Sequence, residues 1–198
     1  MRQYYQHYDL SDLDVLYDQF DPKVVSRALT SAVNKTQRKL RTRIRLEVRK
    51  RYNVTARSIN RRVTLTAAKL QKPDAMLKYL GPRIGLINFS SRPKVVRITG
   101  RRGRKIKRVG VTVKVRRDGP RKFVSAVPAF IAEGRSGNRH VFARTTEART
   151  PLRARYSLSI PQMVGNKEVI DTAFLLTKEE LPKEFDHAMD FFLGKLGK

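Results

Sequence analysis

The sequence predicts an α+β protein in which a long N-terminal helix packs on a mainly antiparallel β-sheet and a C-terminal helix completes the fold. Apolar residues recur at three- and four-residue steps over residues 22–52, which is the spacing of one helix face. From residue 63 to residue 160 the apolar residues follow a period of two, which is typical of half-buried strands. The helical spacing returns near residue 167, so the strands are expected between two helical segments.

The first helix has a clear start and a clear apolar face. Asp21 is expected as the N-cap and Pro22 as the first helical residue, because both types favour these positions. The apolar stripe predicts that Leu29, Val33, Leu40 and Ile44 are buried. Arg38, Arg41 and Arg45 fall off the stripe and are expected to be exposed or to contact a partner.

The other elements follow from turn residues and periodicity. A short helix capped by Thr55 is expected near residues 56–61. Two helical segments are expected at the end of the chain, over residues 167–177 and 179–196. The expected strands are 63–66, 75–80, 86–90, 95–98, 109–115, 122–132, 139–145 and 155–160.

A basic hairpin loop is expected between the strands at 95–98 and 109–115. Its sequence, TGRRGRKIKRVG over residues 99–110, carries six bases between two glycines. These bases are Arg101, Arg102, Arg104, Lys105, Lys107 and Arg108. We expect them to contact either DNA phosphates or an acidic neighbouring protein, and we treat solvation as the third alternative.

The charge divides the chain into three parts. The formal net charge is +27, from 44 Lys and Arg against 17 Asp and Glu. Residues 1–21 form an acidic arm, residues 22–166 a basic α+β domain, and residues 167–198 an acidic helical segment. The acidic ends can either fold back on the basic body of the same chain or contact neighbouring copies, and the sequence leaves both alternatives open.

Composition excludes several functions. The chain has no cysteine, which excludes disulfides, thiol catalysis and cysteine-based zinc sites. It has no apolar run long enough to cross a membrane, and residues 1–20 lack the apolar stretch of a signal peptide. The three histidines lie far apart and the body has few acids, so we expect neither an enzyme nor a bound metal or cofactor.

The positive charge exceeds what solubility requires, so an anionic partner is expected. Lys and Arg bind phosphates of any sequence with release of counterions. The aromatic residues of the body fall at strand positions compatible with a core, and no base-reading motif is present. Any contact with nucleic acid is therefore expected to be independent of base sequence.

Several motifs occur in an order that resembles a known family. The segment 26–68 begins the match, and the pieces 85–92, 111–115, 127–132, 137–144 and 151–164 follow. The most specific are PAFIA, HVFAR and the run from Arg149 to the SIPQM at 159–163. Together they resemble minor tail protein Z of tailed bacteriophages and prophages over residues 24–166, without contribution from residues 1–20 or the C-terminal helix.

The resemblance implies a structural virion protein. It implies a tail-completion component at the tail end that joins the head, built as a ring of six copies around the DNA passage. The implied partners are other copies of the chain, a tail terminator or tail tube protein and head–tail connector proteins, with no membrane. The implied locations are the tail or neck of the virion and, during assembly, the host cytoplasm. The alternative is a standalone protein that binds nucleic acid without sequence specificity.

Overall fold

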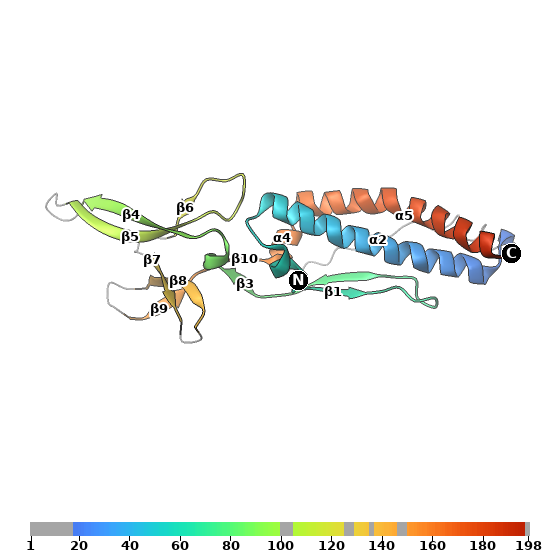
Figure 1. Cartoon of the computed structure of the whole chain (residues 1–198), viewed down its shortest axis with the longest axis horizontal. Helices are drawn as coiled ribbons and strands as arrows, with labels where there is room; N and C mark the ends of the chain where they lie inside the picture. The colour runs from blue at the N-terminus through green and yellow to red at the C-terminus, as the bar shows by residue number, and fades with distance from the viewer. Residues whose placement is uncertain (1–17, 100–104, 125–128, 135–136, 146–149, 197–198) are drawn as a thin grey trace. The chain divides into compact units, whose positions relative to one another are not determined.

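A computed structural model describes residues 18–99, 105–124, 129–134, 137–145 and 150–196, and it confirms the α+β class (Figure 1). The chain divides into two compact units, and each takes residues from separate stretches of sequence. The first unit combines residues 1–47, 60–80 and 164–198, and the second combines 48–59 and 81–163. The division of the chain by charge is not tested by these units and stays a prediction.

The helix α2 runs from Pro22 to Arg51, as the sequence predicts. The backbone N–H of Lys23 donates to Asp21 Oδ1 at 2.8 Å, so Asp21 is the expected N-cap. The last turn carries Arg49, Lys50 and Arg51, whose positive charges face the negative end of the helix dipole.

In the first unit, α2 lies beside α5, which runs from Lys167 to Leu196 (Figure 1). Val25 and Ala28 of α2 pack against Ala188 and Met189 of α5 in a buried cluster. The start of α2 therefore meets the end of α5, and the two helices are antiparallel. The two predicted helices at 167–177 and 179–196 are in fact this one helix, which continues through Pro182.

The other side of α2 in this unit carries a hairpin of β1 (Val63–Thr66) and β2 (Met76–Tyr79). Gln37 Nε2 donates to the carbonyl oxygens of Thr66 and Met76, both at 2.8 Å. Asn34 Nδ2 donates to the carbonyl oxygen of Ala68 at 3.1 Å, and the backbone N–H of Ala68 donates to Asn34 Oδ1 at 2.8 Å. Two amide side chains of the helix thus hold the hairpin, because they satisfy backbone groups that a two-stranded sheet leaves open.

The second unit contains most of the strands. They are β3 (Arg83–Gly85), β4 (Arg92–Thr99), β5 (Lys105–Val113), β6 (Lys122–Phe123), β7 (Ala129–Glu133), β8 (Arg139–Arg144), β9 (Leu152–Ala154) and β10 (Tyr156–Ser159). All described pairs are antiparallel, in the orders β4-β5-β6, β7-β8-β9 and β10-β3. With β1-β2, the described strands form four small sheets rather than the single sheet expected from the sequence.

One expected strand is differently built. Residues 86–88 form the 3₁₀ turn η1 (Leu86–Asn88), not a strand, and the buried Phe89 follows it. The expected strand 155–160 corresponds to β10, which ends at Ser159 because Ile160 begins the helix α4 (Ile160–Val164). Ser159 and Gln162 form a reciprocal capping box, with Ser159 N donating to Gln162 Oε1 at 2.9 Å and Gln162 N donating to Ser159 Oγ at 3.4 Å. The SIPQM motif is therefore a helix start.

The short helix α3 (Ala56–Asn60) and the segment before it also belong mostly to the second unit. Ser58 N donates to Thr55 Oγ1 at 3.2 Å, which confirms the predicted cap. Asn53 Nδ2 donates to the carbonyl of Lys114 at 2.8 Å, and Arg117 N donates to the carbonyl of Arg51 at 2.8 Å. The end of α2 is thus bonded to the segment that follows β5.

One glycine in β5 has a packing role. A Cβ at Gly110 would lie 2.2 Å from the ring of Phe123, which sits on the neighbouring strand β6. The missing side chain lets the Phe123 ring cover the backbone of β5 at this point, although the ring remains 44% exposed.

Candidate functional site

The α2 helix presents basic side chains toward α5, where they meet acids. Lys39 Nζ lies 2.5 Å from Glu180 Oε2 and 2.6 Å from Glu184 Oε1. Lys35 Nζ lies 3.6 Å from Glu184 Oε2. Two acids of the predicted acidic C-terminal segment are thus neutralised within the same chain, which is the first of the two alternatives left open by the sequence.

These contacts shift the ionisation of all three partners. The hydrogen bond from Lys39 lowers the pKa of Glu180 and of Glu184 below the usual range. The same hydrogen bonds raise the pKa of Lys39 above its usual value. The cluster is therefore fully charged at neutral pH, although the groups lie at the surface, where solvent screens each pair strongly.

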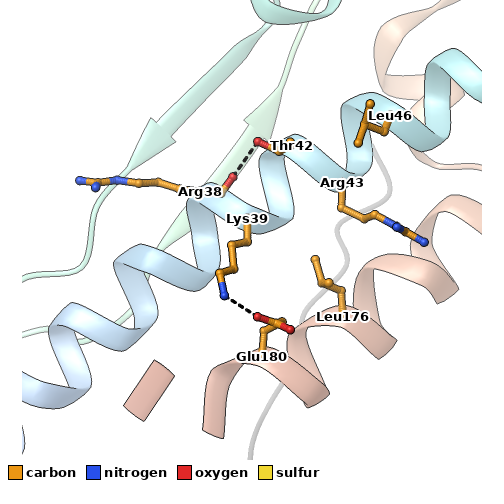
Figure 2. A pocket seen from close by; sticks show the side chains of 7 residues that line it. All are labelled: Arg38, Lys39, Thr42, Arg43, Leu46, Leu176 and Glu180. Atoms are coloured by element: carbon orange, nitrogen blue, oxygen red, sulfur yellow. Dashed lines mark hydrogen bonds and ion pairs between the residues drawn. The ribbon is translucent and has the colours of Figure 1, made fainter. Parts of the chain in front are cut away.

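The predicted contact residues Arg38, Arg41 and Arg45 lie on another side of α2. Arg38 is exposed, and Figure 2 shows its side chain directed away from Glu180 and Leu176 of α5. Arg41 and Arg45 are half-buried. In the parts of the chain that the structure describes, none of the three forms an ion pair with an acid, so their charge is available to an anionic partner.

Tyr79 at the end of β2 is influenced by the charges of two of these arginines. Its hydroxyl is buried and has no hydrogen-bond partner among the described residues. Burial raises the pKa of Tyr79 to about 12, while the charges of Arg41 and Arg45 act in the opposite direction. Arg41 and Arg45 thus lie close enough to Tyr79 for their charges to act on it, and Arg38 is the exposed residue of the three.

The basic hairpin is longer and more regular than the sequence predicts. β4 pairs with β5 from Arg92 opposite Thr112 to Thr99 opposite Lys105. Lys105, Lys107 and Arg108 therefore belong to strand β5, whereas the sequence places them in a loop. Arg101, Arg102 and Arg104 lie outside the described residues.

In the register of this hairpin, Arg97 of β4 is the backbone partner of Lys107 of β5.

An open pocket between α2 and α5 is a feature that sequence reasoning missed (Figure 2). Arg38, Lys39, Thr42, Arg43 and Leu46 of α2 line it, with Leu176 and Glu180 of α5. Leu46 is 48% exposed and lies outside the apolar stripe of α2. A leucine surrounded by bases and off the buried face was the available signal, but no local pattern indicates which residues lie opposite it.

The described residues contain no group of three His, Asp or Glu side chains that could hold a metal ion. None of the helices in the described ranges is both long enough and apolar enough to cross a bilayer.

The fold and the composition define a strongly basic α+β protein, with bases on α2, on the β4–β5 hairpin and on other described segments. The family model of prophage minor tail protein Z matches residues 13–196, and the chain belongs to this family. It is a structural protein of a phage tail and a component of the virion. No curated protein and no solved structure matches the chain.

The family match is longer than the resemblance read from the motifs. It extends from residue 13 to residue 196, whereas the motifs covered residues 24–166. The expectation that the C-terminal helix contributes nothing was therefore wrong, and α5 belongs to the family domain. The structure gives the reason, because α5 forms the core of the first unit together with α2.

Proposed function

We propose that the protein is a tail-completion component at the head-proximal end of the tail. Six copies form a ring around the DNA passage and join the tail to the head. The partners are further copies of the chain, the tail terminator or tail tube protein, and the head–tail connector proteins. The protein acts in the tail or neck of the virion and assembles in the host cytoplasm.

The observation that carries this proposal is the match of the minor tail protein Z family to residues 13–196. The net charge of +27 supports it, because a ring around a DNA passage faces a dense row of phosphates. Arg38, Arg41 and Arg45 of α2, which form no ion pair with an acid among the described residues, and the basic hairpin supply charge for such a contact. The contact would be electrostatic and would not depend on base sequence.

The ring is tested by the size of the assembled protein. The purified chain is measured by light scattering and negative-stain electron microscopy, alone and with the tail tube and tail terminator proteins. A closed ring of six copies in either sample supports the proposal. A chain that remains monomeric both alone and with the two tail proteins contradicts the proposal.

The position in the virion is tested separately. In a phage that carries a nonsense codon in this gene, heads and tails are expected to accumulate unjoined. Antibody labelling of intact virions is expected at the neck. Normal joined particles without the protein would contradict the proposal, and label along the tail shaft or at the distal tip would place the protein elsewhere.

A further inference from the structure

The helix α5 has a face that lies open to solvent in the described part of the chain. Leu175 is at its centre and is 62% exposed, more than any other large apolar side chain in the described ranges. Leu175 precedes Glu184, which pairs with Lys39 of α2, by nine residues, and nine residues make two and a half turns of helix. Leu175 therefore points away from α2, on the opposite side of α5.

Acidic side chains flank Leu175 on this open face. Asp171, Leu175, Glu179 and Asp186 follow one another at steps of four, four and seven residues, so they form one stripe along the helix, the acidic stripe. The three acids are exposed, and none of them forms an ion pair among the described residues. The exposed Lys178 lies at the edge of the stripe and leaves its net charge negative. Such a surface repels nucleic acid and suits a cationic protein surface.

The helix α2 carries the opposite charge on its own solvent-facing side. Arg27, Arg38 and Arg45 follow one another at steps of 11 and 7 residues, which return to the same side of a helix, and we call them the basic stripe. Arg27 and Arg38 are exposed and Arg45 is half-buried. In the described ranges none of the three forms an ion pair, and Arg45 Nε has no hydrogen-bond partner. The basic stripe therefore has charge available for a partner.

The two stripes match in length as well as in charge. At 1.5 Å per residue, Asp171 to Asp186 spans about 22 Å and Arg27 to Arg45 about 27 Å, with three charges on each stripe. The stripes do not meet within one chain, because the acidic stripe lies on the side of α5 that is turned away from α2. Their complementarity can therefore be used only between two copies.

We propose that the acidic stripe of α5 in one copy docks on the basic stripe of α2 in the next copy. The carboxylates pair with the guanidinium groups, and the aliphatic stems of the arginines cover Leu175. Because the two stripes are different surfaces, the contact is head-to-tail, and such contacts produce a ring when the rotation between copies closes. The inference rests on the proposed ring and names the contact between its copies.

Charge reversal tests this pairing. The acid variant is Asp171→Lys, Glu179→Lys, Asp186→Lys, and the base variant is Arg27→Glu, Arg38→Glu, Arg45→Glu. Each variant alone should remain monomeric in light scattering, because two stripes of like charge then face each other. An equal mixture of the two should form rings again, since each reversed stripe meets its complement on the other variant and six copies can alternate. Recovery in the mixture also shows that both variants are folded.

A control and the wild type separate this inference from the proposed function. The control changes three exposed bases of the same unit outside the stripe to glutamate, Arg61, Lys69 and Lys78, and it should form rings like the wild type. A wild-type ring with variants that still assemble alone, or that stay apart when mixed, overturns the inference and leaves the ring standing. A wild-type chain that is monomeric even with the tail proteins overturns both.

Cross-linking locates the contact without altering charge. The chain has no cysteine, so Leu175→Cys and Thr42→Cys each carry one thiol, and Thr42 is exposed between Arg38 and Arg45 on α2. Mixing the two proteins with a short bismaleimide should give covalent dimers that contain one copy of each. The control mixes Leu175→Cys with Met76→Cys, because Met76 of β2 is 54% exposed and lies outside both stripes. Equal yields in both mixtures overturn the proposal, as does Leu175→Cys linking best to itself, which would indicate a symmetric contact between two α5 helices.

Discussion

Ile44 and Leu40 lie about one turn apart on the apolar stripe of α2, but the structure buries them unequally. Ile44 is 6% exposed, whereas Leu40 is half-buried. Leu29 is buried as predicted, and Val33, like Leu40, is only half-buried. The predicted apolar face of α2 is therefore the face that packs in the fold, but the burial of its side chains varies along the helix.

This difference gives a prediction for single truncations. Ile44→Ala should lower the free energy of unfolding by about 2–4 kcal/mol, because it removes buried methyl groups and leaves a cavity. Leu40→Ala should cost clearly less, because solvent already reaches the side chain. Urea denaturation of both variants measures the two values. Equal losses would show that the two positions are equally buried.

The contact between α2 and α5 predicts a dependence on pH. The folded-state pKa of Glu180 and Glu184 lies below the ordinary value of 4.5, so their contribution is present above that value and is lost as the pH falls through the lowered pKa. Lys39, whose pKa is raised above 10.5, contributes below that value and loses its contribution at higher pH.

The variant Lys39→Met tests this pairing. It should be slightly less stable than the wild type at neutral pH, and the difference should disappear in acid as the two glutamates become protonated. Urea unfolding from pH 7 to pH 2 measures the difference. Lys50→Met is the matched control, because Lys50 is exposed and pairs with no acid in the described ranges. A difference that persists in strong acid would contradict the prediction.

Pro182 gives a second prediction at the level of the helix. It lies inside α5 and has no N–H to donate to the carbonyl of Lys178. Pro182→Ala should therefore raise the free energy of unfolding by about 1–3 kcal/mol. Lys178→Ala, which keeps the backbone unchanged, should have little effect. A Pro182→Ala protein that is less stable would show that the proline has a structural role in α5.

The whole molecule carries a charge that predicts how it meets DNA. Binding to duplex DNA should weaken steeply with salt and should not depend on base sequence. Changing the six hairpin bases to serine should lower the affinity and flatten the dependence on salt. These bases are Arg101, Arg102, Arg104, Lys105, Lys107 and Arg108. Fluorescence anisotropy over a salt series measures both quantities.

A control of equal charge is needed for this comparison. It changes six exposed bases outside the hairpin, Arg57, Arg61, Arg62, Lys69, Lys78 and Arg83, to serine. If the hairpin contacts DNA, this control should change the affinity less than the hairpin variant does. Equal effects would assign DNA binding to overall charge, and a hairpin variant that only fails to assemble would favour an acidic protein partner.

Local patterns in the sequence were enough to predict the class of the fold and most of its elements. The spacing of apolar residues predicted α2, and Asp21 predicted where it begins. Both signals are local, because a buried helix face and an N-cap each require particular residue types close together in the sequence. The long alternation at 109–115 gave β5 in the same way, although its true start at Lys105 was hidden by a run of bases.

Which elements contact one another could be learned only from the folded chain. An alternating apolar pattern predicts a strand but not the strand with which it pairs. The sequence therefore suggested a single sheet, whereas the described residues form four small sheets. The pairing of Lys39 with Glu180 and Glu184 spans more than 140 positions of sequence, and no spacing rule could reveal it. Tyr79 lies near Arg41 and Arg45 for the same reason. Contacts between distant segments depend on packing, which local sequence patterns do not encode.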